Sequence, residues 1–186
     1  LYVIGGEKSG YFDSMPVHLI SGRIPQNESE ILLPEHLSSN GGVTWKEGDR
    51  ITLKIGRRTL DGFTMGQDNP CYTYDPESRD EGLNDEVIDN TIERTYTVVG
   101  IYERPSFEPR TAPGYTALTV EDPSWQNPTE IHVYFNMKDP GEVYNFMVDM
   151  GFAKTYSYGF NDDVLLYYGV SYFDSFRTML YSLAAI

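Results

Sequence analysis

The stretch His18–Leu33 constrains the fold of this chain more than any other, because two apolar runs are joined there by a loop that must bend. Gly22 permits backbone dihedrals that other residues avoid, and Pro25 fixes φ and removes a hydrogen-bond donor. The pattern predicts a strand near His18–Ile20, a polar loop, and a second strand at Ile31–Leu33. No recognisable catalytic motif lies in this stretch, so its residues by themselves indicate a core element with a solvated loop.

Alternating apolar residues predict most of the other strands. Arg50–Ile55 is the clearest case, and a turn at Gly56-Arg57 would connect it to a further strand that ends near Phe63. Thr91–Glu103 is apolar or amphipathic on both faces, which is typical of a central strand, and Gly100 within it indicates a bulge or close packing. Two more strands are expected, at Tyr115–Val120 and Glu130–Met137.

Helix signals are concentrated near the end of the sequence. Asp139–Glu142 combines an N-cap Asp, a Pro at the first helical position and a Glu three residues after the cap, and Gly151 is the expected stop. Phe152–Tyr158 is predicted to return as a strand, Asn161–Leu166 to form a short helix, and Pro34–Leu37 to form one helical turn. Strands in hairpin-like succession with late helices predict an α+β fold, with a mixed, mainly antiparallel sheet, a few helices and room for two lobes.

The last segment, Ser171–Ile186, opens with a capping-box pattern and stays apolar to the end of the sequence. Asp174 and Arg177 are its only charged residues. A soluble helix would show a polar face and a stop signal, so we expect a longer apolar helix to begin here. The sequence also begins at Leu1 without Met or a signal peptide, which suggests a fragment or a processed form.

The formal net charge is −14, from 14 Lys and Arg against 28 Asp and Glu. Nucleic-acid binding needs a basic surface and is therefore disfavoured, whereas a cationic peptide would be attracted. The simpler interpretation is that the acidity only keeps the domain soluble. Acidic residues gather in a predicted surface loop, Gly66–Asn90, where the run Asp75–Asp89 would either bind a cation or only be solvated, since it lacks the ligand spacing of a calcium loop.

No residue of the sequence is assigned to a catalytic, cofactor-binding or metal site, and no cofactor is expected. The histidines, His18, His36 and His132, do not lie at metal-ligand spacing from one another or from Cys71, the single cysteine. No nucleophile elbow, phosphate loop or dinucleotide motif occurs. A hydrolase with two convergent carboxylates stays open as an alternative, but nothing selects a pair among the 28 acidic residues.

Three segments, taken in order, resemble the extracytoplasmic domain of FtsX-like, MacB-type ABC transporter permeases. The first is Leu19–Pro25, LISGRIP, followed by Asn27 and Glu30–Leu33, which is similar to that family's GR-x-P … E-I segment. The second, Glu47–Leu53 with the sequence EGDRITL, is similar to its G-D-x-I strand. The third, Tyr96–Tyr102 with the sequence YTVVGIY, is similar to its Y-x-V-V-G-I strand.

The resemblance extends over most of the chain, because Asn161–Leu166 and Ser171–Ile186 are similar to the run into that family's second transmembrane helix. Gly66–Asn90 and Arg104–Pro113 match nothing in the family pattern. The resemblance implies one MacB periplasmic-core-like domain over residues 1–186, between the first and second transmembrane helices, with an inserted lobe at about 56–130.

The resemblance also implies a function. The domain would be non-catalytic, would lie on the extracytoplasmic side of the cell membrane, and would be coupled mechanically to a cytoplasmic ATPase. Its partners would be the rest of the permease chain and the ATP-binding subunit, the latter not through this domain. The substrate would be a cationic peptide or a lipoprotein, in export or in resistance to antimicrobial peptides. The alternative is a secreted or cell-surface carbohydrate- or peptide-binding module, with some of the 15 tyrosines as its platform.

Overall fold

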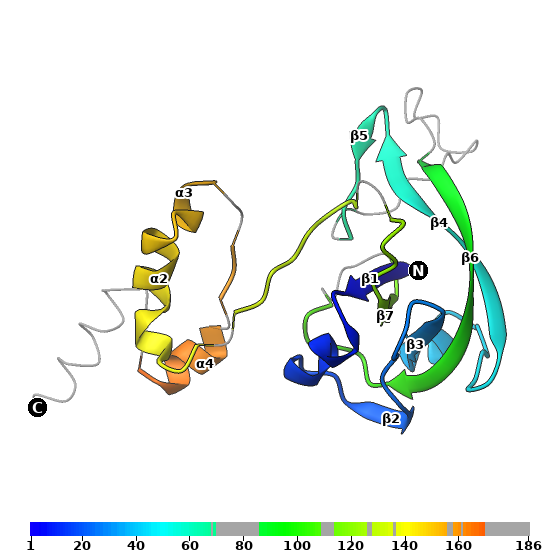
Figure 1. Ribbon diagram of the computed structural model, residues 1–186, viewed down its shortest axis with the longest axis horizontal. Coiled ribbons are helices and arrows are strands. Elements are labelled where there is room, and N and C mark those ends of the chain that lie inside the picture. The colour runs from blue at the N-terminus through cyan, green and yellow to red at the C-terminus, as the bar shows by residue number, and fades with distance from the viewer. Residues whose placement is uncertain are drawn as a thin grey trace, which may run out of the picture. The chain divides into compact units, whose positions relative to one another are not determined.

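The computed structural model describes residues 1–67, 69, 86–108, 114–125, 128–135, 137–155, 158–160 and 162–169. The chain divides into two compact units, Leu1–Ile131 and His132–Ile186, which are described separately (Figure 1). The first unit holds the sheet and the second holds short helices. The single extracytoplasmic domain and its inserted lobe at about 56–130 stay predictions of the sequence.

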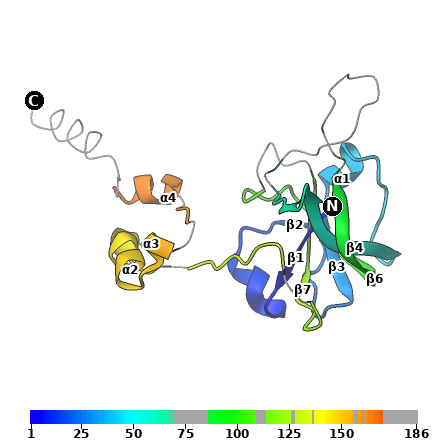
Figure 2. The ribbon, with the colours of Figure 1, turned by 90° about the horizontal axis from the view of Figure 1, so that it is seen from above.

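A curled sheet of seven strands forms the first unit, as far as the chain is described (Figures 1 and 2). The strands are β1 (Tyr2–Gly6), β2 (Leu19–Gly22), β3 (Glu30–Pro34), β4 (Arg50–Leu60), β5 (Phe63–Thr64), β6 (Val87–Tyr102) and β7 (Thr116–Val120). Their order is β1-β7-β3-β6-β4-β5, with β2 paired to β6. The β1–β7 and β3–β6 pairs are parallel and the other pairs are antiparallel. The α+β fold with a mixed, mainly antiparallel sheet is confirmed.

β6 is the central strand, as its two-sided apolar pattern predicts. It pairs with β4 from Val87 to Thr97 and with β3 and β2 beyond that point. The register with β3 shifts so that Val99 is the extra residue of a bulge. At the next position, a Cβ on Gly100 would lie 2.6 Å from the Ser21 carbonyl oxygen, so only glycine lets β2 approach this closely.

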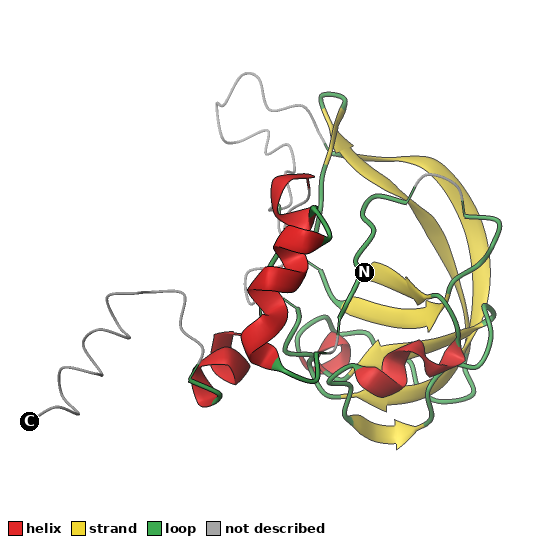
Figure 3. Cartoon of the chain, turned by 60° about the vertical axis from the view of Figure 1, so that its left-hand side comes forward, coloured by secondary structure: helices red, strands yellow, loops and turns green. Residues whose placement is uncertain are grey.

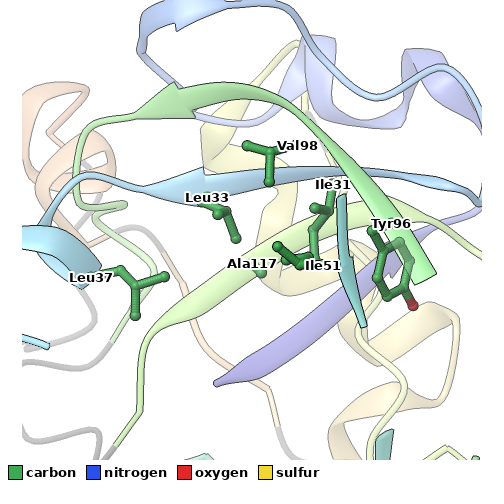
Figure 4. Packing of buried hydrophobic residues seen from close by; sticks show 7 residues of the cluster. All are labelled: Ile31, Leu33, Leu37, Ile51, Tyr96, Val98 and Ala117. Atoms are coloured by element: carbon green, nitrogen blue, oxygen red, sulfur yellow. The ribbon is translucent and has the colours of Figure 1, made fainter. Parts of the chain in front are cut away.

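Two apolar clusters cover the two faces of this sheet. Successive strand residues point to opposite faces, and adjacent Ile31 and Leu32 of β3 accordingly belong to different clusters. The cluster drawn in Figure 4 gathers side chains from four strands and from α1 (His36–Ser39), namely Ile31, Leu33, Leu37, Ile51, Tyr96, Val98 and Ala117. The other consists of Phe12, Leu32, Tyr102 and Leu118. Phe12 comes from a 3₁₀ helix at Ser9–Ser14.

The second unit contains α2 (Val143–Asp149), α3 (Phe152–Thr155) and α4 (Asp162–Tyr167), drawn as red helices in Figure 3. A 3₁₀ turn at Pro140–Glu142 leads into α2, and the Asp139 side chain accepts a hydrogen bond of 2.9 Å from the Gly141 N–H. α2 ends before Gly151, whose φ of 73° places it in the left-handed region. Both helix boundaries agree with the capping signals in the sequence.

The predicted turn at Gly56-Arg57 is wrong. β4 runs on to Leu60 with a register shift between Ile55 and Arg57, because Gly56 marks a bulge in which a Cβ would lie 2.5 Å from the Asp89 carbonyl oxygen. The chain turns instead at Asp61-Gly62, with φ values of 51° and 82°. An Asp-Gly pair with positive φ at both residues is a favoured hairpin turn, and this signal was missed.

Two predicted strands are also wrong. Residues 131–135 form no strand, and their apolar side chains are exposed, with Ile131 at 81% and Val133 at 67%. Phe152–Thr155 is helical, since Phe152 packs beside Phe146 of α2 with ring centroids 6.3 Å apart. The end of the predicted acidic loop belongs to β6 from Val87, while most of that loop and the segment Ser171–Ile186 lie outside the described residues.

Candidate functional site

The most deeply buried charged group among the described residues is the carboxylate of Glu108, whose side chain is 0% exposed. Glu108 follows β6, close after the buried Pro105, and its N–H donates to the Pro105 carbonyl at 3.1 Å. Nothing in the sequence indicates a role for Glu108, because it lies in the Arg104–Pro113 segment that matches no family motif. A single Glu between prolines carries no signal that it will be buried.

Three donors from different parts of the first unit meet at this carboxylate. His36 Nε2 of α1 lies 2.8 Å from Glu108 Oε1, and the Arg104 Nε lies 2.9 Å from the same oxygen. The N–H of Thr116, the first residue of β7, donates to Glu108 Oε2 at 2.9 Å. The site therefore ties α1, the segment after β6 and β7 together through one charge, which a buried carboxylate requires.

The chemistry open to this Glu108 cluster is limited by its geometry. A His paired with a carboxylate is the arrangement that positions a general base, but the carboxylate here is also occupied by Thr116 and Arg104. His36 Nδ1 is buried and has no hydrogen-bond partner in the part of the chain that is described. The His36 ring lies 5.0 Å from the Tyr115 ring. The arrangement is that of a structural tie.

A second charged group is the pair Arg23–Glu30, which joins the start of the loop after β2 to the first residue of β3. The two guanidinium nitrogens Nη1 and Nη2 donate to the two Glu30 oxygens at 2.6 Å each, and the Gln26 N–H donates to Glu30 Oε2 at 2.9 Å. These hydrogen bonds, that of Arg23 foremost, lower the pKa of Glu30 to about 2, although burial opposes the shift. Arg23 and Glu30, which lie seven residues apart in the sequence, thus close this loop through a bidentate ion pair.

The same loop depends on two residues that the sequence singled out. Gly22 has a φ of 75°, and a Cβ there would collide with the Val99 carbonyl oxygen. Pro25 is fully buried. Asn27 Oδ1 accepts from the Ser29 N–H at 3.0 Å and so forms an Asx turn before β3.

The three segments that resemble the permease family meet on one part of β6. The Arg23 N–H donates to the Val99 carbonyl at 3.0 Å. In the Glu47–Leu53 segment, the Gly48 N–H donates to the Val98 carbonyl, and the Asp49 carbonyl accepts from the Val98 N–H, both at 2.9 Å. Motifs that are far apart in the sequence therefore form one hydrogen-bonded unit around Val98 and Val99.

A third polar group fixes the chain after β7. Arg94 Nε donates to Asp122 Oδ2 at 2.7 Å and its Nη2 to Ser124 Oγ at 2.5 Å. Ser124 also donates its N–H to Asp122 Oδ1 at 2.8 Å. Hydrogen bonds from Ser124 and Arg94 lower the pKa of Asp122. Two other buried polar atoms, Tyr96 Oη and Trp125 Nε1, have no hydrogen-bond partner in the described part of the chain.

The three histidines, which the sequence did not assign to a metal site, each have their own surroundings in the structure. Among the described residues, no three of His, Cys, Asp and Glu are grouped so that they could hold a metal ion. His36 is bound to Glu108, His18 is exposed beside β2, and the His132 ring lies 6.4 Å from that of Tyr134. Cys71 and most of the acidic run Asp75–Asp89 lie outside the described residues. Whether this run binds a cation or is only solvated is therefore not tested by the structure.

The second unit exposes many aromatic side chains. Five tyrosines there have exposed fractions between 46% and 86%: Tyr134, Tyr144, Tyr158, Tyr167 and Tyr168. Only Met147 and Leu165 of the described residues in this unit are buried apolar side chains. An apolar surface of this extent on so small a unit is typical of a segment that contacts something else.

Comparisons with known proteins identify no relative. No family model, no curated protein and no solved structure matches the chain. Within the described residues, no helix is long and apolar enough to cross a membrane.

Proposed function

We propose that this chain is the non-catalytic extracytoplasmic domain of an ABC transporter permease of the FtsX-like, MacB-type kind. It would contact substrate or a partner outside the cell membrane and be coupled mechanically to a cytoplasmic ATPase. One observation carries the proposal: the three family-like segments occur in the expected order, and all three join at Val98–Val99 of β6 through backbone hydrogen bonds. Motifs with a shared structural role are harder to obtain by chance than three isolated short matches.

The chemistry of the described residues is consistent with mechanical rather than catalytic use. The Glu108 cluster joins three elements of the first unit, and the Arg23–Glu30 pair closes the loop between β2 and β3. Ties of this kind stiffen a domain, and a domain that transmits motion must be stiff. Candidate substrates are a cationic peptide or a lipoprotein, the former favoured by the net charge of −14.

The test determines the location and the partners of the full gene product in the organism that encodes it. Cys71 and every other cysteine of the gene product are replaced by Ser, and Phe63→Cys then introduces a single thiol at a side chain that is 75% exposed. We expect the protein in the membrane fraction, labelling by a membrane-impermeant maleimide before lysis, and co-purification of an ATP-binding subunit. Labelling that occurs only after lysis would contradict the proposal.

A second candidate function is a secreted or cell-surface module that binds carbohydrate or peptide. The exposed tyrosines of the second unit favour it, because aromatic rings with hydrated hydroxyls suit such ligands. The same experiment separates the two functions. Release of the protein into the medium without an ATP-binding subunit would support the module, and broadening of tyrosine NMR signals on adding a soluble glycan would identify its ligand class.

A further inference from the structure

β2 has an open edge. Among the described strands it pairs with β6 alone, and the backbone groups of Leu19–Gly22 make no hydrogen bond to any other described segment. Figure 1 shows β2 at the lower end of the first unit. All four of its residues are exposed. An unpaired edge of this kind is a template on which an extended chain can add as a further strand.

The side chains of β2 do not protect this edge. Leu19 and Ile20 are 43% and 51% exposed, and the strand contains no charged residue and no proline. β4 offers a contrast, since it pairs with β5 only at Thr59 and Leu60. The first half of β4 pairs with β6 on one side, and its other edge has no partner among the described strands. This half carries the exposed cations Arg50 and Lys54, and charged residues on an edge strand discourage the addition of another strand.

The charges around β2 determine which kind of segment would be attracted. Glu103 lies at one end, where its N–H donates to the His18 carbonyl at 2.9 Å. Glu47 lies at the other end, with its carboxyl carbon 3.0 Å from the position of a Cβ on Gly22. Both are exposed. Lys46 and Arg50, which flank Glu47 in the sequence, carry the opposite charge, so the long-range attraction is governed by the net charge of −14.

Arg23 and Arg104, which follow Gly22 and Glu103 in the sequence, do not offset these carboxylates. Arg23 is bound by Glu30 through both guanidinium nitrogens, and Arg104 is bound by Glu108. A second copy of this chain is a poor occupant of the edge, because two molecules that each carry a charge of −14 repel one another.

We propose that β2 is a strand-addition site for an extended protein segment in which basic and apolar side chains alternate. Its backbone would pair with the open edge of Leu19–Gly22, its apolar side chains would contact Leu19 and Ile20, and its cations would lie near Glu47 and Glu103. Because β2 is short, the affinity is moderate and depends on salt. The proposal goes beyond the proposed function, since it does not require the chain to be part of a transporter.

The test uses the 186-residue chain and a fluorescent, end-blocked peptide of alternating lysine and valine, with binding measured by anisotropy. We expect saturable binding that weakens at high salt and that is lost when alternate peptide nitrogens are methylated. Ile20→Lys should weaken it roughly tenfold, because a cation then stands on the edge. The matched control is Ile88→Lys, since Ile88 of β6 is similarly exposed, at 54%, and should leave binding unchanged.

Each alternative result overturns the proposal. Equal loss in Ile20→Lys and Ile88→Lys would show a general charge effect, and unchanged binding of the methylated peptide would exclude backbone pairing. Self-association of the free chain that Ile20→Lys abolishes would make a second copy the occupant. Slow hydrogen exchange throughout Leu19–Gly22 in the free chain would show that the edge is already covered. Both substitutions are at exposed positions, and matching thermal unfolding curves would verify that the variants fold.

Discussion

Two tyrosines of β6 show how single polar atoms in the core differ in their contribution to the stability of the fold. Tyr102 and Tyr96 are 0% and 1% exposed. The Tyr102 hydroxyl donates to the Thr116 carbonyl at 2.8 Å, whereas the Tyr96 hydroxyl has no partner among the described residues. Burial raises the pKa of both phenols, that of Tyr96 to about 12. A buried hydroxyl without a hydrogen bond is a net loss of stability.

Removal of the two hydroxyl groups should therefore affect the free energy of unfolding differently. Tyr102→Phe removes the hydrogen bond to Thr116 and should lower the free energy of unfolding by roughly 1–2 kcal/mol. Tyr96→Phe removes an unsatisfied group and should leave that free energy unchanged or raise it by about 1 kcal/mol. The two variants serve as controls for each other, and urea denaturation measures both. A loss of stability in Tyr96→Phe as large as in Tyr102→Phe would mean that a water or an undescribed residue satisfies Tyr96.

The Arg23–Glu30 pair should make stability depend on pH. The pKa of Glu30 is lowered from 4.5 to about 2, so its carboxylate stabilises the folded state fully above pH 4.5, and this contribution is lost as the pH falls toward about 2. Glu30→Gln should lower the free energy of unfolding by roughly 1 kcal/mol at neutral pH. The difference from the wild type should shrink between pH 4.5 and about 2 in a series of denaturation curves. A difference that is constant with pH would contradict the charge-based origin.

The buried carboxylate of Glu108 should be far more sensitive than a surface carboxylate on the same segment. Glu108→Gln removes the charge that His36, Arg104 and Thr116 share, and should lower the free energy of unfolding by about 3 kcal/mol. Glu103→Gln, at an exposed position five residues earlier, should change it by less than about 0.5 kcal/mol. Thermal unfolding of the two variants side by side measures the contrast. Equal, small changes would show that the Glu108 cluster is not a structural tie.

At the scale of elements, β6 organises the sheet because it alone pairs with β2, β3 and β4 among the described strands. Its pattern of apolar residues on both faces predicted a central strand, and Gly100 predicted a close contact. Both are confirmed. The sequence could not give the partners of β6, because pairing joins segments whose complementarity is expressed only when the chain has folded.

Gly100→Ala tests the contact between β6 and β2. The added methyl group would lie 2.6 Å from the Ser21 carbonyl oxygen and 2.9 Å from the Arg23 nitrogen, so β2 must move away from β6. We expect faster hydrogen exchange at Ser21–Arg23 and a loss of about 1–3 kcal/mol in stability. Gly114→Ala is the matched control, because its Cβ would meet no atom of the described residues closer than 3.9 Å. Unchanged exchange in Gly100→Ala would contradict the close approach of the two strands.

Elements set by local signals were predicted better than those set by distant contacts. Asp139 and Gly151 identified the boundaries of the helical segment around α2, because capping depends on residues within one turn. Phe152–Thr155 was predicted as a strand, although it packs as a helix beside α2. A short apolar segment is compatible with either structure, and only its packing partner decides.

At the scale of the whole molecule, the two units differ in how much core they possess. Leu1–Ile131 contains two apolar clusters, while His132–Ile186 buries only Met147 and Leu165 among its described apolar residues. The described residues of the second unit therefore contribute little buried apolar surface, which is the main source of folding free energy.

We therefore expect the fragments to behave differently. A fragment ending at Ile131 should fold cooperatively, with the β-type circular dichroism of the whole chain. A fragment beginning at His132 should show no cooperative thermal transition in dilute buffer. Circular dichroism melting curves of both fragments and of the entire chain measure this. A cooperative transition in the second fragment would show that residues outside the described part complete its core.

The sequence by itself determined the α+β class, the central position of β6, the capped start of the α2 region and the acidic character of the surface, because these depend on local patterns and on composition. Only the tertiary structure decided where the β4–β5 turn lies, how the three family-like segments join at Val98–Val99, and that Glu108 is buried among His36, Arg104 and Thr116. It also left Leu19–Gly22 with an open edge. These features arise from contacts between distant residues, which no local pattern encodes.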